Sequence, residues 1–208
     1  MSNVLASHPL YHEAAKSLQE RLRDVHLPFP LRHEWQGQDQ DNIAPASQDL
    51  ITACLSLTPA SDWTQELSSI YAALKAEGLF LGVILSGESL HELRACLIEA
   101  ESAVAGGASP RLYTMPDPQS LGRALLTTGF TLPVVDTQRV TLVYDDLYAL
   151  LRELQEARCT PPLPERSRCF TRRAVFEKAN KIYAERHSAA GGGITTTLDL
   201  VFLHGWKE

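Results

Sequence analysis

The chain lacks the patterns that mark several whole classes of protein. Its 208 residues hold only four cysteines, and no two of them have the C-x-x-C spacing of a zinc site or a redox pair. No stretch approaches the roughly 18 apolar residues that a membrane span needs. The first 25 residues carry Glu13, Glu20 and Asp24 and have no apolar run, unlike a secretory signal or an acid-poor transit peptide. We therefore expect free thiols in a reducing, cytoplasmic compartment.

Basic residues are also scarce over most of the chain. Residues 1–150 carry 9 Lys and Arg against 18 Asp and Glu, whereas residues 151–208 carry 10 against 7. The net charge is -6 and the pI is about 5.6, which disfavours nucleic acid and anionic lipid as partners. One basic cluster stands out, and it fits either a solvated helix start or a docking site for an acidic partner. It consists of Arg166, Arg168, Arg172 and Arg173.

Catalytic signatures are missing as well. No phosphate-binding glycine loop occurs, and no Ser-His-Asp or Cys-His set has a recognisable local context, so hydrolase chemistry is disfavoured. His8 and His12 stand four residues apart, but no third metal ligand is indicated, which favours two surface histidines. What is present is an ordinary globular composition, with 44% hydrophobic residues. Residues 1–208 are expected to form a single domain.

Hydrophobic periodicity predicts helices alternating with strands. Continuous apolar runs at 49–57 and 79–85 are typical of buried parallel strands. Between them we expect a helix through Leu74, with Gly78 at its C-terminal end. Further strands are expected at 132–136, 139–144 and 196–204. Five more helices are predicted over 10–24, from Gly87 to Gly106, and over 118–128, 145–156 and 171–186. This order predicts an α/β fold whose sheet is mostly parallel with an antiparallel C-terminal edge.

Two segments carry a family resemblance over about Asp49 to Lys207. Leu74-Lys75-Ala76-Glu77-Gly78-Leu79-Phe80 is followed closely by Gly87-Glu88-Ser89-Leu90-His91-Glu92-Leu93-Arg94. The chain is similar to class I S-adenosylmethionine-dependent methyltransferases. It most resembles the biotin-pathway malonyl-carrier-protein methyltransferases and the methyltransferase-like factors that assist assembly of respiratory complex I. The resemblance implies a Rossmann-type sheet for residues 49–208.

The family's cofactor motif is absent. The resemblance implies a first strand followed by a glycine-rich turn, where glycines let the backbone approach the methionine part of the ligand. Here the 48 residues before the first matching strand contain one glycine, Gly37. Residues 1–48 thus form a helical lead and an atypical linker, with 31–35 as a remnant strand. We expect a reduced, internally truncated methyltransferase-like domain without the usual cofactor pocket.

Loss of the first strand has a consequence for partners. The family's sheet order places that strand beside the fourth, so the edge of Asp49–Leu57 would lie bare. Either residues 31–35 pair there, or a protein partner or a second copy does. Tyr144, Asp145 and Asp146 end a strand and are expected to cap the next helix.

A candidate cleft follows the two matching strands at their carboxyl ends, where open α/β sheets bind ligands. The resemblance places the stretch of Asp62 and Trp63 beside the reacting methyl group, although Asp62 also suits a helix cap. Glu88, His91, Glu92 and Arg94 would share a helix start, either lining a substrate mouth with an acid–imidazole pair or forming structural ion pairs. The candidate cleft comprises Ser56, Thr58, Asp62, Trp63, Glu88, His91, Glu92 and Arg94.

The resemblance and the missing motif together set two functional expectations. The first is a degenerate, non-catalytic methyltransferase-like protein that acts through protein contacts in assembly or maturation, with no cofactor. The alternative is an active S-adenosylmethionine-dependent methyltransferase whose cofactor site is rebuilt from other residues or completed by another chain. A pocket beside Ser56–Thr58 would favour the enzyme, whereas filling of that space by Trp35 would favour the binding protein.

Overall fold

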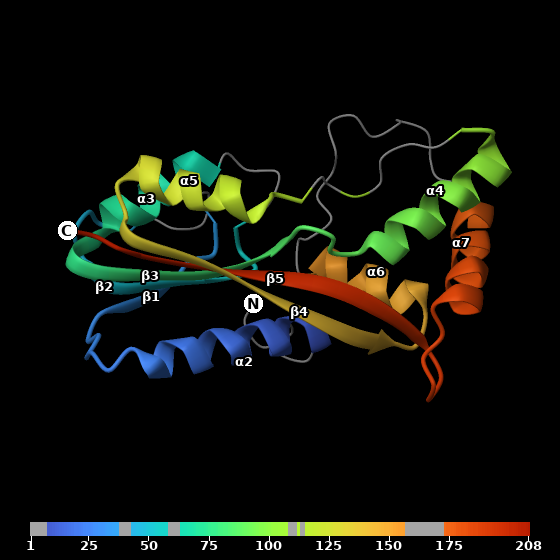
Figure 1. The fold of residues 1–208 in the computed structure, drawn as a ribbon, viewed down its shortest axis with the longest axis horizontal. Helices are drawn as coiled ribbons and strands as arrows, with labels where there is room; N and C mark the ends of the chain where they lie inside the picture. The colour runs from blue at the N-terminus through green and yellow to red at the C-terminus, as the bar shows by residue number, and fades with distance from the viewer. Residues whose placement is uncertain (1–7, 38–42, 58–62, 108–111, 113–114, 157–172) are drawn as a thin grey trace.

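A five-stranded sheet with helices on both faces forms the molecule (Figure 1). The computed structural model describes residues 8–37, 43–57, 63–107, 112, 115–156 and 173–208. The strand order is β1-β2-β3-β5-β4. The strands are β1 (Arg32–Glu34), β2 (Gln48–Cys54), β3 (Leu74–Ser86), β4 (Thr131–Tyr144) and β5 (Ile194–Trp206). Strands β1, β2 and β3 are parallel, and β5 runs antiparallel to both β3 and β4, so the expected mostly parallel sheet with an antiparallel side is confirmed.

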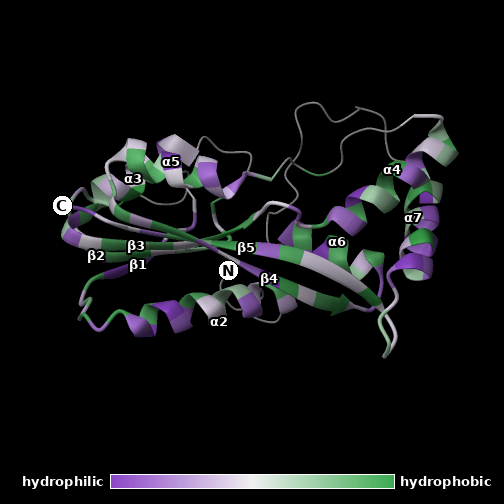
Figure 2. Ribbon diagram, in the orientation of Figure 1, coloured by the Kyte–Doolittle hydropathy of each residue, from purple (hydrophilic) through white to green (hydrophobic). Residues whose placement is uncertain are grey.

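The helices form two layers and an end group. Helix α2 (Pro9–Asp24) lies under one face of the sheet, and α3 (Trp63–Ala73) and α5 (Pro118–Thr128) lie over the other (Figure 1). Helices α4 (His91–Ala105), α6 (Leu147–Glu156) and α7 (Arg173–Arg186) gather where β4 and β5 extend past the other strands. Figure 2 shows the central strands β2 and β3 as largely hydrophobic, as the two-sided burial requires.

Alternation along β3 divides the core between the two faces. Leu81, Val83 and Leu85 join the cluster that includes α2, whereas Phe80 and Ile84 join the cluster beneath α3 and α5. Successive side chains of a strand point to opposite faces, so one apolar run serves both layers.

Several predicted boundaries are wrong. Helix α3 ends at Ala73, and Gly78 lies inside β3 rather than at a helix end. The last helix carbonyls are satisfied instead by non-local donors: Lys207 Nζ donates to the Tyr71 oxygen at 2.8 Å, and the N–H groups of Ala46 and Ser47 donate to the oxygens of Ala72 and Ala73. The two segments expected at 132–136 and 139–144 are one strand, β4, with an irregular register between Thr131 and Val134. Non-local pairing with β5 holds this strand together across the polar residues in its middle.

Helix α5 has the predicted bounds because its ends are set locally. The Asp117 carboxylate accepts the backbone N–H of Ser120 at 2.9 Å and caps the N-terminus. Gly129 ends the helix with a φ of 106°, a left-handed conformation that glycine adopts readily.

The edge of β2 is covered by the chain itself. Arg32, His33 and Glu34 pair in parallel with Leu50, Ile51 and Thr52. Of the two expected arrangements, the structure therefore has the remnant strand, which pairs with residues 50–52 of the edge expected at 49–57. A partner on the rest of that edge stays a prediction.

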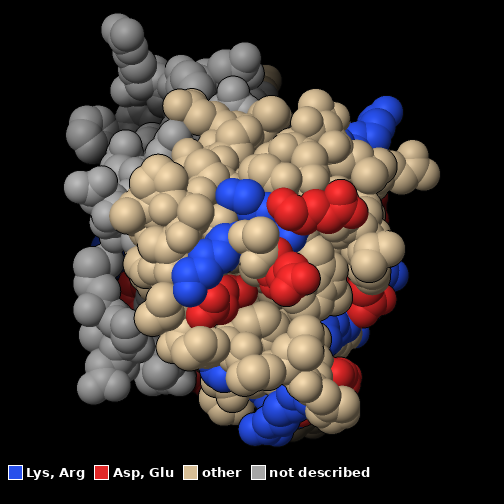
Figure 3. Space-filling model, turned by 90° about the vertical axis from the view of Figure 1, so that its left-hand side faces the viewer, with Lys and Arg blue, Asp and Glu red and all other residues tan. Residues whose placement is uncertain are grey.

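Charged side chains are mixed on the end of the molecule that carries the starts of β2 and β3. On this face basic and acidic groups alternate rather than gather by sign (Figure 3). One pair joins Lys75 Nζ to Asp49 Oδ1 at 2.8 Å, which holds the pKa of Asp49 below its usual range. In the part of the chain that the structure describes, no helix combines the length and apolar composition of a membrane span.

Protonation of His204 is expected to destabilise the fold. This β5 residue pairs with Leu81 and Val134, and its buried Nε2 has no hydrogen-bond partner among the described residues. Burial lowers the pKa of His204. The unfolded chain therefore takes up this proton first, and stability should fall as the pH drops below about 6.5, by at most about 1.4 kcal/mol per pH unit.

Chemical denaturation between pH 5 and pH 8 measures this dependence. Replacing His204→Leu should flatten the profile, whereas His12→Leu, at an exposed helix position, should leave it unchanged. An unaltered profile in the His204 variant would assign the dependence to other groups.

Candidate functional site

The carboxyl ends of β1, β2 and β3 meet at one edge of the sheet, where ligands bind in open α/β folds. Glu34 ends β1, Cys54 ends β2 and Ser86 ends β3. The candidate site has two halves, one around β1 and β2 and one around the turn that follows β3.

The first half contains a group that the sequence did not single out. Tyr11 of α2 donates its hydroxyl to Glu34 Oε1 at 3.0 Å. The pKa of Tyr11 is raised, chiefly by burial and further by Cys54 and Glu34 beside it. The signal that could have identified Glu34 is its acidic side chain in the expected remnant strand, at the position where a sheet presents ligand-binding groups.

The backbone turns sharply where β2 ends. Leu55 has a φ of 54°, a left-handed conformation that is strained for leucine. The next residue, Ser56, has a buried Oγ with no hydrogen-bond partner among the described residues. A buried hydroxyl without a partner is uncommon and leaves a polar group available to a ligand or water.

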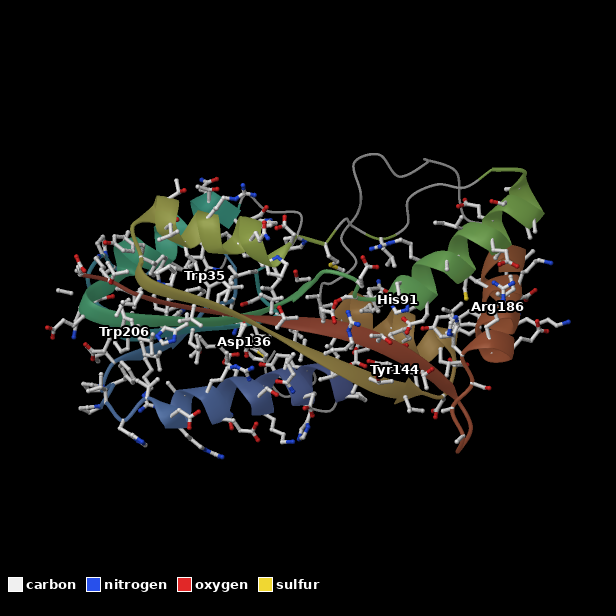
Figure 4. All side chains as sticks on the ribbon, in the orientation of Figure 1. Trp35, His91, Asp136, Tyr144, Arg186 and Trp206 are labelled. Carbon is white, nitrogen blue, oxygen red and sulfur yellow. The ribbon has the colours of Figure 1, made fainter. Side chains whose placement is uncertain are left out.

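Trp35 fills the space beside these strand ends. Its side chain is 2% exposed and belongs to the cluster that contains Leu57, Leu67 and Ile70. Its Nε1 donates to Glu66 Oε2 of α3 at 3.2 Å. The indole thus connects the end of β1 to α3. Figure 4 shows the labelled Trp35 on the side of the sheet that carries α3.

The second half is a tightly bonded turn. Ser86 Oγ donates to the Pro116 carbonyl, and Ser89 Oγ donates to the Ser86 carbonyl and accepts the N–H of Asp199. Gly87 has a φ of 59°, and a Cβ there would lie 3.0 Å from Asp199 Oδ2. The position therefore requires glycine for both its conformation and its close approach.

Asp199 and Arg139 form the charged centre of this turn. Arg139 donates from Nε to Oδ1 at 2.7 Å and from Nη2 to Oδ2 at 3.0 Å, and the N–H of Glu88 donates to Oδ2 at 3.2 Å. These bonds lower the pKa of Asp199 and raise that of Arg139. Asp199 is only 5% exposed, so the pair fixes the turn to the sheet.

The expectation that Glu88 shares a helix start with His91, Glu92 and Arg94 is wrong. Leu90 has a φ of 61°, so α4 begins at His91 and Glu88 lies before the helix. The imidazole Nδ1 of His91 lies 3.1 Å from the Glu88 carbonyl oxygen and 3.5 Å from Glu92 Oε2. Glu92 is 5% exposed and accepts the N–H of Thr197 at 3.1 Å, which is a structural bond. Arg94 follows on α4, partly buried.

The remaining predicted residues have separate positions. Trp63 begins α3 and packs, partly buried, against the core that contains Trp35. Thr58 and Asp62 lie outside the described residues, so the role of Asp62 stays a prediction. The same holds for Arg166, Arg168 and Arg172, whereas Arg173 pairs with Glu177 on α7.

Two side chains that the sequence assigned to structure, His8 and Asp146, have identifiable partners. His8 pairs with Glu156 of α6, and the described residues contain no group of three metal-binding side chains. Asp146 Oδ1 accepts the N–H of Ala149 at 2.8 Å, which confirms its capping of α6. Cys54 and Cys96 are buried and form no disulfide among the described residues, and Cys159 and Cys169 lie outside them.

Sequence relatives come from two groups. The chain is 29% identical over 164 residues to the human protein "Arginine-hydroxylase NDUFAF5, mitochondrial", a match over 76% of this chain and 46% of that protein. It is 29% identical over 198 residues to a malonyl-[acyl-carrier protein] O-methyltransferase of Xylella fastidiosa, covering 93% of this chain and 63% of the relative. The chain thus spans about half to two thirds of the length of these curated relatives. No family model matches the chain.

Comparison of the fold points the same way. A crystal structure of a putative methyltransferase from Bacillus halodurans aligns with a TM-score of 0.51 at 10% identity. The alignment covers 91% of this chain and 98% of that one. At this identity the likeness concerns the fold alone.

Proposed function

Because the chain belongs to the class I methyltransferase-like family, we propose that it is a member without the usual cofactor pocket that acts by binding another protein. The observation that carries this proposal is the position of Trp35. Where the family's first strand leads into a glycine-rich turn, β1 is followed by an indole that is 2% exposed. A side chain occupies the place that glycines would keep open for a ligand.

The state of Glu34 supports the same proposal. This carboxylate stands at the end of β1 but accepts the Tyr11 hydroxyl at 3.0 Å, so one of its oxygens is already engaged by α2. In the second half of the site, the Arg139 guanidinium and the Glu88 N–H are likewise engaged by Asp199. Most of the polar groups named at this edge therefore already have hydrogen-bond partners within the chain. This arrangement suits a surface whose role depends on its fixed shape.

The relatives support a protein as the partner. The name of one group is that of an arginine hydroxylase, and the name of the other specifies an acyl-carrier protein as the bearer of the methylated group. We propose a role in assembly or maturation of another protein. The cytoplasmic location expected from the sequence stays a prediction, and the name of the human relative places that protein in mitochondria.

Ser56 favours a second candidate function. Its buried Oγ has no hydrogen-bond partner among the described residues, and it lies two positions after Cys54, the last residue of β2. A cofactor site rebuilt around this hydroxyl would make the chain an S-adenosylmethionine-dependent methyltransferase. Here the residues would bind and orient the cofactor, which would supply the methyl group.

Calorimetric titration with S-adenosylmethionine and S-adenosylhomocysteine separates the two candidates. We expect no saturable heat up to millimolar ligand, and no rise in melting temperature. A ligand present at about 100 times its Kd would stabilise the fold by about 2.7 kcal/mol, which a thermal scan detects readily.

Saturable micromolar binding would contradict the leading proposal. Ser56→Ala would then locate the cofactor, because it removes the unpartnered hydroxyl from the β2 end. Ser68→Ala is the matched control, since that serine lies on the exposed side of α3. Loss of binding in the first variant alone would establish the rebuilt site.

A further inference from the structure

Strand β4 leaves a long backbone edge at the side of the sheet opposite β1. It is the last strand in the order β1-β2-β3-β5-β4, and it pairs with β5 from Thr131 to Tyr144. Figure 1 shows its outer side without another strand beside it. A fourteen-residue edge strand is well above the usual five or six residues, and proteins normally cover or shorten such edges.

Apolar side chains are exposed along this edge on both faces. Val134 is 51% exposed and Val143 is 53% exposed. Their register with His204 and Thr195, without irregularity between them, places them on opposite faces of the sheet. Leu132 is 76% exposed and has a φ of 47°, so a strained backbone holds a leucine side chain in solvent.

Next to the exposed edge, the sheet carries ring side chains that are partly or fully buried. Val134 pairs with His204, whose ring lies 5.8 Å from that of Trp206, and Trp206 in turn lies 6.4 Å from the Phe29 ring. Figure 4 shows Trp206 and Asp136 on this side of the molecule. The exposed apolar groups are therefore those of the edge itself, and an open edge strand with exposed Leu132, Val134 and Val143 is one that proteins normally cover.

The sequence of β4 indicates which partner fits. Its two ends are apolar, with Leu132 to Val135 at one end and Val140 to Tyr144 interrupted only by Thr141 at the other. Its middle, Asp136 to Arg139, is polar, with the acidic residue on one side of the centre and the basic residue on the other. The pattern reads nearly the same in both directions, so an antiparallel copy of the strand complements it.

We infer that two copies of this chain pair antiparallel through β4 and form a continuous ten-stranded sheet. Two-fold symmetry places a given residue of both copies on the same face of the joined sheet. Two registers then centre the pairing on the middle of β4. One puts Thr137 opposite Thr137 of the other copy, and the other puts Thr137 opposite Arg139. Either register places Val134 opposite Val140 or Leu142 of the other copy. Neither register places two Asp136 or two Arg139 side chains opposite each other, so like charges do not meet. Each of these charges is already paired within its own chain, Asp136 with Arg21 and Arg139 with Asp199.

The pairing would form enough main-chain hydrogen bonds for a stable interface. An antiparallel overlap of about twelve residues gives about ten main-chain hydrogen bonds after Pro133, which lacks an N–H, is subtracted. A typical stable interface has about ten direct hydrogen bonds. The charges and Pro133 at this edge would also limit pairing with unrelated strands, as such residues do on other sheets.

Light scattering coupled to size exclusion, at protein concentrations from 1 to about 100 micromolar, tests the inference. We expect a dimer whose Kd rises at least about tenfold in Val134→Lys and in Val143→Lys, because symmetry brings each new charge into the interface twice. Leu126→Lys is the matched control. Leu126 is 61% exposed on α5, and its replacement should not change the Kd.

Cross-linking identifies the strand at the interface. Thr137→Cys should link rapidly to its copy with a short bis-maleimide, because the two positions lie opposite or diagonal to each other. Thr141→Cys should not, since its copies would be about 20 to 27 Å apart. The parent protein reports the background from native cysteines, of which Cys54 and Cys96 are buried.

Two results would overturn the inference. One is a monomer across the whole concentration range, which would leave the edge to a strand of another protein. The other is a dimer that is insensitive to both lysine variants or that links through Thr141→Cys rather than Thr137→Cys. Neither result depends on whether S-adenosylmethionine binds, because the candidate site lies at the carboxyl ends of β1, β2 and β3, whereas the proposed interface is the outer edge of β4.

Discussion

Replacing Trp35 with alanine is expected to lower the free energy of unfolding by about 4 kcal/mol, in the range of large-to-small aromatic substitutions in cores. The indole is 2% exposed and packs among Leu57, Leu67 and Ile70, so its removal leaves a cavity. The substitution also removes the donor to Glu66, a carboxylate that is only 4% exposed and would lose its partner.

Urea denaturation followed by circular dichroism measures this loss. Trp35→Phe is the matched variant, because it keeps most of the apolar volume and removes only the Nε1 donor; we expect a loss of about 1 to 3 kcal/mol. A loss below about 1 kcal/mol in the alanine variant would show that the space beside β1 collapses easily or is already open, against the proposal that the indole fills it.

Arg139→Ala is expected to cost about 2 kcal/mol at pH 7, the range for a hydrogen bond to a buried charge. The variant leaves the Asp199 carboxylate, 5% exposed, with the Glu88 N–H as its remaining hydrogen-bond donor among the described residues. We expect a loss of stability near the low end of this range because the Arg139 side chain is 63% exposed and its charge is screened by solvent.

The pH dependence of this effect has a definite sign. The pKa of Asp199 is lowered in the folded state, first by the hydrogen bond from Arg139, so the unfolded chain takes up its proton at a higher pH. The stabilisation is complete above the unfolded value of about 3.9 and is lost as the pH falls through the folded one. The difference between the parent and Arg139→Ala should therefore shrink when denaturation is repeated near pH 3.

Arg139→Lys provides the control for this pair. Lysine keeps the charge but cannot reproduce the two parallel N–H bonds to the carboxylate, so we expect an intermediate loss. Equal stabilities of the alanine variant and the parent at pH 7 would mean that the turn after β3 is held by Ser86 and Ser89 alone.

The sequence predicts those parts of the fold that local chemistry determines. Helix α5 has the expected bounds because Asp117 and Gly129 cap it from within a few residues. Gly78 misled the prediction because its role is non-local: a Cβ there would lie 2.8 Å from the Lys75 oxygen, and its carbonyl accepts the N–H of Lys207. A glycine needed for close approach cannot be told from a helix terminator by spacing alone.

The candidate site was predictable to a lesser degree. The carboxyl ends of the strands were identified correctly, and Trp35 was recognised as the residue that could fill the cleft. Tyr11 was missed because its contact with Glu34 spans 23 positions and depends on where α2 packs. Glu88 does not share the helix start of His91 because the left-handed Leu90 delays the helix. This is a tertiary constraint, since the Leu90 N–H donates to the Thr197 carbonyl.

The order of strands in the sheet constrains how the chain folds during synthesis. Strand β5, which is made after β3 and β4, lies between them, and its pairing of Leu200 with Leu85 spans more than a hundred residues. Until residues 194–206 leave the ribosome, β4 has no partner strand and one edge of β3 is bare. Late closure of such distant contacts is slow and exposes apolar edges, so the growing chain is expected to depend on chaperones over this interval.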